Sequence, residues 1–596
     1  MRLMRRGILG CVAVMFLIAS VARAGVMDQV PEDALVVLKI RNLTATSGKL
    51  GKFMTDLGVA AMEPGLADPL TFLTKKANIS QGLKADGELA AVFLDPAKTA
   101  ESPDNSMVLL IPVTDYAAFL GNFADAKTED GVSELKMGDS PKPGYMSDWG
   151  GFAALSPSKT IVAKKPSAML KVAGAATAQE LSGKDVILFA NFVGLRAQLL
   201  PVLQGSKDEI LAQVESGVKS EEKMAKFAPV IRTVVSQVIL MGESFLRDAN
   251  SASVGLNFGA DGINLTVMAE FEKGSYLGDV VAMEKCTDEQ FLRGLPTGKY
   301  LFFGGGCENS KVALKVIDDF VAPILKEVNA MGPEMSAAND YMDSLRAYIA
   351  AIKGQAIGFV APTGALGQEA IIQFINVSAG DGAAQSAAYQ RMLQAQEELM
   401  KSFGAAADAW KTTFTPAAKV LDGVSFDNIS TVFNMNAQDP MGMQQAQIMA
   451  MLYGPGGVNV LMGPAGDNLI MASGVRDPIL SATIKAIKEN AAPLADLPGV
   501  KSVSANLPKI RAAALFVPVD EIVNTGLTYA KQFGAGLQVQ LPPDLPPIGF
   551  TISTEGTAAK IDAYVPSTLV QSLVAAGMQA AMQMRGGNKP GGAGGL

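Results

Sequence analysis

Apolar and polar residues alternate along two segments of the chain, one near its middle and one near its end. The apolar side chains of each segment lie on one side of an extended backbone: Ile263, Leu265, Val267, Ala269 and Phe271 in the first, and Ile561, Ala563 and Val565 in the second. Strands with one apolar and one polar side are typical of an antiparallel sheet that packs one face and exposes the other. We therefore predict antiparallel strands here, with the apolar side packed.

Helices alternate with strands in blocks. Residues 311–328 carry an apolar stripe with helical spacing, Ser310 can cap its start, and Pro323 should kink or divide the helix. The apolar run 34–40 ends near the charged Lys39, which predicts a strand that emerges at a sheet edge. The recurring unit is a strand, a helix, a hairpin and a helix. We predict an α+β fold, with mainly antiparallel sheets and helices packed on one face.

The second half of the chain repeats short motifs of the first half in the same order. The clearest is Asp-Gly-Val-Ser, at 130–133 and again at 422–425. The other pairs are 89–96 with 356–362, Gly150-Gly151 with Gly456-Gly457 (each expected to open a hairpin), 186–189 with 513–516, and Gly255 and Gly262 with Gly549 and Gly556. Ordered self-similarity of this kind predicts a tandem duplication, with two related lobes at 25–290 and 291–585.

The spacing between matched motifs changes at two places, and insertions are expected to fall in connections rather than in core strands. The first half has extra residues between Phe189 and Gly255, in a stretch with a helical pattern. The second half has extra residues at about 435–455, a stretch rich in methionine. We expect any function special to this protein to lie where the two halves differ.

The methionine-rich stretch predicts a surface for a partner, because methionine side chains are flexible, apolar and adaptable. The residues are Met441, Met443, Met449 and Met451. A site for a soft metal ion is the weaker alternative, since no cysteine or histidine joins the cluster.

The first 24 residues have the parts of a secretory signal peptide. Three arginines precede an apolar stretch at 7–21, and Ala-Arg-Ala at 22–24 fits a cleavage site. We expect the mature chain to begin at Gly25, in the periplasm or outside the cell. No later stretch is expected to span a membrane. The glycine-rich residues 586–596 are predicted to be a disordered tail.

The composition excludes several classes of chemistry. The chain contains no histidine, which excludes Ser-His-Asp and Cys-His catalysis and imidazole zinc sites. Its formal net charge is −8, and an acidic chain without basic clusters is a poor binder of nucleic acid. Ser-x-x-Lys, the spacing of a serine nucleophile and a lysine base, lacks its companion motifs. It occurs at Ser133/Lys136, Ser156/Lys159, Ser216/Lys219 and Ser220/Lys223. No catalytic, cofactor-binding or metal-binding residue is predicted.

Two cysteines remain after the leader, Cys286 and Cys307. Export would permit a disulfide between them, across the predicted junction of the lobes. Two buried free thiols are the alternative, because the sequence does not show whether the two Cα atoms come close enough for a bridge.

Residues 30–37, Val-Pro-Glu-Asp-Ala-Leu-Val-Val, follow the leader closely. This Pro-x-Asp-Ala entry into an apolar strand, followed by repeated hairpin-and-helix units, resembles a class of bacterial exported proteins with a domain of unknown function. The resemblance covers the opening motif and the general rhythm of the chain. It implies export and an α+β fold, and it carries over no activity, cofactor or site residue.

Three functions are compatible with these patterns. The first is an exported, non-catalytic protein that binds a partner or acts as an envelope-associated scaffold. The second is a carrier of an apolar small molecule or lipid between the two lobes, which the apolar composition and the methionine-rich stretch favour. The third is a hydrolase that works without histidine, through carboxylates or a Ser-Lys pair.

Overall fold

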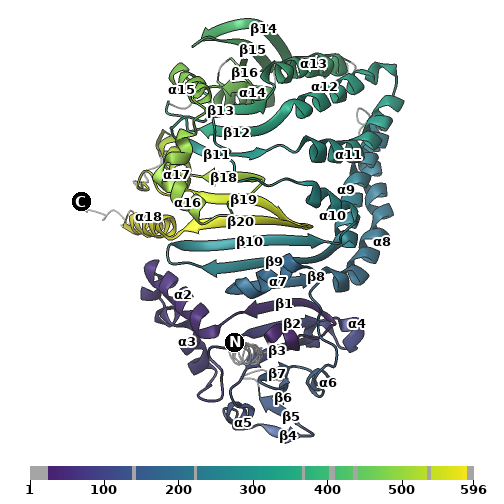
Figure 1. Ribbon diagram of the computed structural model, residues 1–596, viewed down its shortest axis with the longest axis vertical. Helices are drawn as coiled ribbons and strands as arrows, with labels where there is room; N and C mark the ends of the chain where they lie inside the picture. The colour runs from purple at the N-terminus through teal and green to yellow at the C-terminus, as the bar shows by residue number, and fades with distance from the viewer. Residues whose placement is uncertain are drawn as a thin grey trace, which may run out of the picture. The chain divides into compact units, whose positions relative to one another are not determined.

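The computed structural model describes residues 25–136, 142–220, 225–364, 369–401, 410–433, 440–454, 456–532, 534 and 539–586. The predicted signal peptide and residues 587–596 of the predicted tail lie outside the described residues. The chain folds into two compact units (Figure 1). Unit 1 comprises Met1–Gly51 and Pro64–Leu195, and unit 2 comprises Lys52–Glu63 and Arg196–Leu596. Both units combine helices with antiparallel strands, so the predicted α+β class is confirmed.

Unit 1 is built on one run of antiparallel strands, in the order β8-β1-β2-β3-β7-β6-β5-β4. Their bounds are β1 Ala34–Ile40, β2 Leu89–Leu94, β3 Met107–Pro112, β4 Lys127–Glu129, β5 Val132–Lys136, β6 Pro143–Asp148, β7 Phe152–Ser156 and β8 Val186–Asn191. The helices are α2 Leu43–Asp56, which continues into unit 2, α3 Pro69–Lys76, α4 Pro96–Thr99, α5 Tyr116–Leu120, α6 Lys159–Val162 and α7 Ala175–Gly183. A short 3-10 turn, η1 (Val26–Gln29), packs Val26 into the core.

The strand β1 lies inside the sheet of unit 1, so the prediction that it emerges at an edge is wrong. It pairs with β2 on one side and with β8 on the other. Lys39 is 4 % exposed, and its Nζ lies 2.8 Å from Oε1 of Glu88 and donates to the carbonyl oxygen of Leu181 at 3.0 Å. A charged residue in a strand can therefore mark a buried ion pair as well as an edge.

Unit 2 holds the antiparallel run β9-β10-β20-β19-β18-β11-β12-β13-β17-β16-β15-β14. The bounds are β9 Ala249–Phe258, β10 Gly262–Phe271, β11 Tyr300–Cys307, β12 Ile352–Val360, β13 Gln373–Gly380, β14 Trp410–Leu421, β15 Val424–Phe433, β16 Val458–Ala465, β17 Asn468–Ser473, β18 Ala513–Val517, β19 Ile548–Glu555 and β20 Ala558–Pro566. The order follows the hydrogen-bonded ladders and not the chain, so residues far apart in sequence become neighbours.

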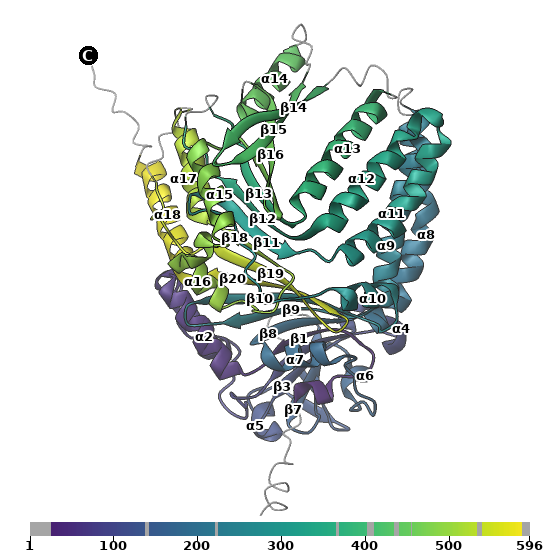
Figure 2. The ribbon, with the colours of Figure 1, turned by 45° about the horizontal axis from the view of Figure 1, so that its top comes forward.

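Two groups of helices belong to unit 2. The first group, along one end of the strands (Figures 1 and 2), is α8 Phe192–Lys219, α9 Ala228–Asp248, α10 Tyr276–Met283, α11 Ser310–Ala330, α12 Ala337–Ala351 and α13 Gly382–Lys401. The second is α14 Pro440–Tyr453, α15 Asp477–Lys488, α16 Pro498–Ala505, α17 Val519–Gln532 and α18 Ser567–Gly586. Pro323 does not divide α11, which is one helix capped at Asn309 instead of Ser310.

Helices cover both faces of the sheet at its β15–β17 end, where one covered face was expected. Leu480 and Ile484 of α15 pack against Ile470 on one side. Tyr348 of α12 and Tyr389 of α13 pack against the cluster that contains Met471 on the other side. This end of unit 2 is therefore a three-layer arrangement.

The strand pairings of the first ten strands recur in the second ten. β1 pairs with β2 and β8, as β11 pairs with β12 and β18. The ladders β2–β3, β3–β7, β4–β5, β5–β6, β6–β7 and β9–β10 have counterparts whose strand numbers are ten higher. Even a register shift recurs, between Ala34 and Val36 in β1 and between Tyr300 and Phe302 in β11. The duplication itself stays a prediction that this repetition supports.

The matched motifs fall mostly at equivalent places in these ladders. Asp130-Gly131 and Asp422-Gly423 make the β4–β5 and β14–β15 turns, all four with positive φ. The glycine pairs are the exception. Gly150-Gly151 joins β6 to β7, whereas Gly456-Gly457 precedes β16, and Gly466 stands in the β16–β17 turn. The predicted match between these two glycine pairs is therefore wrong. Glycine occurs in many kinds of turn, so it does not by itself identify equivalent positions.

The boundaries between the two compact units do not coincide with the point where the order of strand pairings starts again. The predicted lobe boundary at 290 and 291 falls between β10 and β11, where the order of pairings starts again. The hairpin β9–β10 nevertheless belongs to unit 2, because β10 pairs with β20 along its length. The extra residues predicted in the first half form α8 and α9 before β9. Those predicted in the second half include α14, between β15 and β16.

One helix among the described residues, Ala225–Asp248, is long and apolar enough to cross a membrane by length and composition. On that measure, the expectation that no stretch after the leader would reach this length and apolarity is wrong. The helix includes α9, and Phe245 of α9 meets Phe271 of β10 edge-on, with ring centroids 5.7 Å apart. Only 11 % of its apolar window is buried, and length and composition alone do not make the helix a membrane span.

Candidate functional site

A row of aliphatic side chains crosses four neighbouring strands of unit 2. Val254 of β9 stands opposite Val267 of β10, Val267 opposite Ile561 of β20, and Ile561 opposite Ile552 of β19. Their exposed fractions are 40 %, 41 %, 49 % and 48 % in that order. Residues directly opposite each other share a face of the sheet. We call these four residues the apolar row.

The prediction that the apolar side of these strands is packed is wrong at the row. Thr266, beside Val267 in the chain, is 1 % exposed, and Thr551, beside Ile552, is also 1 % exposed. The hydroxyl of Thr266 donates to the carboxylate of Asp562. The polar side is thus the buried one here, and large exposed apolar patches of this kind are characteristic of binding surfaces.

The apolar surface continues beyond the row on the same face. Leu515 of β18 is exposed and stands opposite Phe550, which lies two residues before Ile552 on β19. Farther along, the ring of Phe302 stacks on Phe359 with centroids 4.2 Å apart, and Phe359 lies 6.0 Å from Phe374. The row is therefore one end of an apolar face.

The backbone around the row is already hydrogen-bonded. β10 pairs with β9 and β20, and β20 pairs with β10 and β19. β19 in turn pairs with β18 and β20. An occupant of the row therefore cannot add to the sheet as another strand and has only aliphatic side chains to contact.

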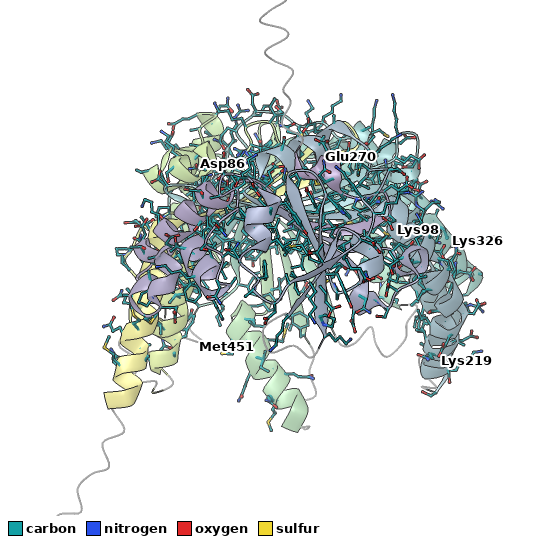
Figure 3. The ribbon with its side chains drawn as sticks, turned by 90° about the horizontal axis from the view of Figure 1, so that it is seen from below. Asp86, Lys98, Lys219, Glu270, Lys326 and Met451 are labelled. Carbon is teal, nitrogen blue, oxygen red and sulfur yellow. The ribbon has the colours of Figure 1, made fainter. Side chains whose placement is uncertain are left out.

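The predicted methionine surface lies on α14, in the connection between β15 and β16. Met443 is exposed, whereas Met449 and Met451 are half-buried, and Figure 3 marks Met451 on this helix. The side chain of Met441 lies outside the described residues. Backbone hydrogen bonds from Ile371 to the carbonyl of Met451, and from residue 372 to that of residue 452, hold the end of α14 against the segment before β13. The partner surface stays a prediction.

Both cysteines are free thiols in unit 2. Cys286 Sγ accepts the backbone N–H of Thr554 at 3.2 Å, and Cys307 Sγ donates to the carbonyl oxygen of Lys285 at 3.1 Å. Cys307 therefore lies against the residue next to Cys286. Burial, with the neighbouring Glu284 and Cys286 acting in the same direction, raises the pKa of the Cys307 thiol to about 11. The bridge between them stays a prediction.

Two lysines of the Ser-x-x-Lys pairs contact carboxylates. Lys159 Nζ lies 3.1 Å from Glu129, and this hydrogen bond raises the pKa of Lys159. Lys219, at the end of α8 in Figure 3, lies 2.6 Å from Glu215. A lysine that acts as a general base needs a lowered pKa, and the contact at Lys159 has the opposite effect. Lys223 lies outside the described residues.

Sequence reasoning found the strands of the row but not its exposure. The alternation at Val267 and Ile561 assigns these side chains to one side of a strand, yet it carries no information on whether other elements cover that side. The missed residues on the neighbouring strands are Val254 and Ile552. These two residues belong to the row because β9 pairs with β10 and β19 pairs with β20.

No protein-family model matches the chain, and no curated protein matches it. Among solved structures, crystal form III of TP0453 matches with a TM-score of 0.20 and 11 % sequence identity, over 48 % of this chain and 100 % of that chain. Crystal form I of TP0453 matches with a TM-score of 0.18 and 10 % identity, over 48 % of this chain and 98 % of that one. Values this low establish no function for this chain.

Proposed function

We propose that this chain is an exported, non-catalytic binding protein that holds a hydrocarbon chain, such as the acyl chain of a lipid, on the apolar row. The observation that supports the proposal is the row itself, with four branched aliphatic residues in register and about half exposed, while Thr266 and Thr551 beside them are buried. The site lies within unit 2, and two of its residues come from each predicted lobe: Val254 and Val267 from the first, Ile552 and Ile561 from the second. The composition of residues 1–24 supports export.

The chemistry of the row favours a hydrocarbon over a peptide. A peptide laid on these side chains would bury backbone N–H and C=O groups against a surface that offers them no partner, at about 1–3 kcal/mol for each group. A hydrocarbon has no such groups to desolvate, and each buried CH₂ contributes about 0.8 kcal/mol.

The size of the row also suits an acyl chain. Three steps between strands, at about 4.8 Å each, make the row about 14 Å long. An occupant would remove the exposed half of each of the four side chains from water. Full burial of a Val or Ile is worth about 1.5–3 kcal/mol, so these four half-burials supply about 3–5 kcal/mol.

The test combines native ligand with defined variants. Native mass spectrometry of protein purified from its own host should show bound lipid mass, and N-terminal sequencing should begin at Gly25. Displacement of a fluorescent fatty acid by palmitate then measures affinity in the double variant Ile552→Thr/Ile561→Thr. Val432→Thr is the matched control, because Val432 of β15 is 47 % exposed and lies off the row.

We expect the double variant to bind palmitate at least about a hundredfold more weakly, because each new hydroxyl would be buried without a partner under the ligand. Its thermal stability should stay close to that of the unchanged protein, since both hydroxyls reach water when the row is empty. Val432→Thr should bind normally. The proposal is wrong if protein purified from its own host carries no bound lipid. It is also wrong if the double variant binds palmitate as tightly as the unchanged protein does.

A further inference from the structure

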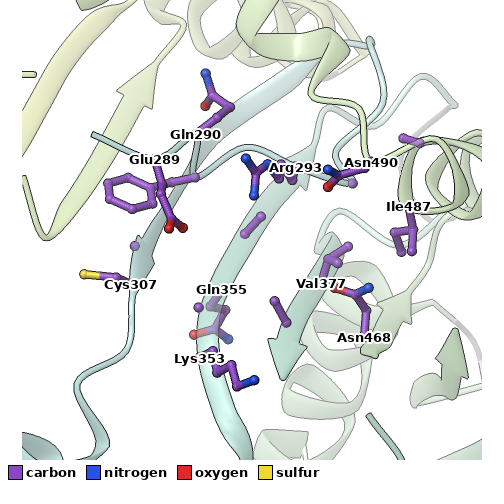
Figure 4. A pocket seen from close by; sticks show the side chains of 17 residues that line it. Glu289, Gln290, Arg293, Cys307, Lys353, Gln355, Val377, Asn468, Ile487 and Asn490 are labelled. Atoms are coloured by element: carbon purple, nitrogen blue, oxygen red, sulfur yellow. The ribbon is translucent and has the colours of Figure 1, made fainter. Parts of the chain in front are cut away.

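A cavity of about 290 Å³ with both apolar and polar residues in its lining lies in unit 2, away from the apolar row (Figure 4). Its walls are the segment 289–294, strands β11 to β13, the first residue of β17 and the end of α15. The polar side chains that line it are Glu289, Gln290, Arg293, Lys353, Gln355, Asn468 and Asn490. The volume is near the lower limit of ordinary ligand pockets, about 300 Å³.

The segment 289–294 packs closely against strands β11 and β13 at the walls of the cavity. A Cβ at Gly305 would lie 2.3 Å from the carbonyl oxygen of Phe291, so the segment sits directly on β11. Gly294 has a φ of +84°, and its N–H donates to the carbonyl oxygen of Ala491 at 3.0 Å. A Cβ there would come within 3.0 Å of Val377 on β13. The cavity is therefore preformed, which lowers the ordering cost of binding.

Two cations in the lining have no carboxylate partner. Neither Arg293 nor Lys353 is in an ion pair among the described residues, whereas Glu289 is the one carboxylate of the lining. The lining therefore carries a net positive charge in a chain whose formal net charge is −8. An unpaired guanidinium beside amide side chains is a suitable receptor for a carboxylate or phosphate.

At two positions of the lining, unit 1 carries apolar residues instead of polar ones. Arg293 stands seven residues before β11, and Met27 stands seven before β1. Asn468 begins β17, and Phe152 begins β7. Met27 and Phe152 belong to the packed core of unit 1. These two positions are thus apolar in unit 1 and charged or polar in unit 2. Unit 1 has its own charged pair nearby, because Lys39 and Glu88 stand where unit 2 has Gly305 and Gly354.

We propose that this cavity binds a small organic anion, whose carboxylate or phosphate group is held by Arg293, while Lys353 at the other end of the lining adds positive charge. The amides of Gln355, Asn468 and Asn490 supply further hydrogen bonds, and Val377 contacts the apolar part of the ligand. The inference does not depend on the apolar row, because none of the four row residues lines the cavity.

Isothermal titration of the full mature chain tests the site with three probes: succinate, inorganic phosphate and lysophosphatidic acid. Binding of either of the first two identifies a free small anion. Binding of the third alone identifies a lipid headgroup in the cavity when Arg293→Met weakens it, because its acyl chain can also bind the apolar row. We expect at least one Kd in the millimolar range or tighter, and we expect it to weaken as salt is raised.

Two variants connect the binding to the cavity. Arg293→Met introduces the residue that unit 1 carries, and Lys353→Gln removes the second charge. Each should weaken the Kd about tenfold or more, by the usual strength of a charge-assisted hydrogen bond. Lys531→Gln, at an exposed lysine in the last turn of α17, should leave the Kd unchanged. Circular dichroism checks that the variants fold.

The proposal is overturned if none of the three probes binds at millimolar concentration. It is equally overturned if a probe binds and the folded Arg293→Met and Lys353→Gln variants retain the original Kd. Loss of palmitate binding to the apolar row would leave this result untouched, so failure of one site is distinguishable from failure of the other.

Discussion

The buried ion pair of unit 1 leads to a prediction about which partner matters more. The side chain of Lys39 is 5 % exposed and that of Glu88 is 25 % exposed. Glu88→Gln leaves a buried ammonium with neutral hydrogen-bond acceptors, such as the carbonyl oxygen of Leu181, but with no counter-charge. Lys39→Met leaves a carboxylate that reaches water and still accepts the N–H of Val26 at 2.9 Å. The loss of Glu88 should therefore cost more than the loss of Lys39.

The expected magnitudes follow from this geometry. Breaking a buried pair by removing one partner costs about 3–5 kcal/mol, and we expect about 3 kcal/mol for Glu88→Gln because Glu88 is partly hydrated. Lys39→Met should cost about 1–2 kcal/mol. In a unit of this size each kcal/mol lowers the Tm by about 2–4 °C, so the two variants should differ by several degrees.

Tryptophan fluorescence reports on unit 1 by itself. The chain has two tryptophans. Trp149 is 1 % exposed in the core of unit 1, and Trp410 begins β14 of unit 2. In a Trp410→Phe background, thermal unfolding followed at Trp149 measures the unit that holds the pair.

The double variant Lys39→Met/Glu88→Gln completes the cycle and should be more stable than Glu88→Gln alone, since no unpaired charge remains. The reasoning is refuted if Lys39→Met lowers the Tm as much as Glu88→Gln does, or if the double variant is the least stable of the three.

Two further predictions concern unit 2. Cys307, whose pKa is raised to about 11, should be alkylated by iodoacetamide at pH 8 far more slowly in the folded protein than in the denatured protein, and mass spectrometry of the labelled peptide measures this; equal rates would contradict it. Gly423→Ala should destabilise by about 1 kcal/mol, because φ is +81° there and open space surrounds the added methyl. Gly526→Ala, within α17 and also open, should stabilise instead; thermal melts that show the same sign for both would contradict the argument.

Local patterns predicted much of the fold. The alternation at 263–271 and 561–565 located β10 and β20, and the strand and helix blocks gave the α+β class. Asp130-Gly131 and Asp422-Gly423, which the sequence showed only as a repeated motif, form tight turns in the structure, because Asp and Gly are the residues that accept positive φ in two-residue hairpins. These features depend on neighbours in the chain, so the chain alone specifies them.

The candidate sites were predicted only in part. The comparison of halves contained a signal for the cavity, namely Arg293 and Asn468 where the first half has Met27 and Phe152. That signal required the ladder register, because the repeated motifs do not extend to these residues. The methionine stretch was visible in the sequence, but its surroundings depend on where α14 packs.

The sequence by itself determined which side chains share a side of each strand, where the chain turns, and that its two halves follow one order of motifs. The tertiary structure decided which strands become neighbours and which faces other elements cover. Lys39 is buried because β8 closes the other side of β1, and Val267 is exposed because its neighbours Thr266 and Met268 face the covered side. Pairing and covering arise between residues hundreds of positions apart, so the local alternation of apolar and polar residues could not specify them.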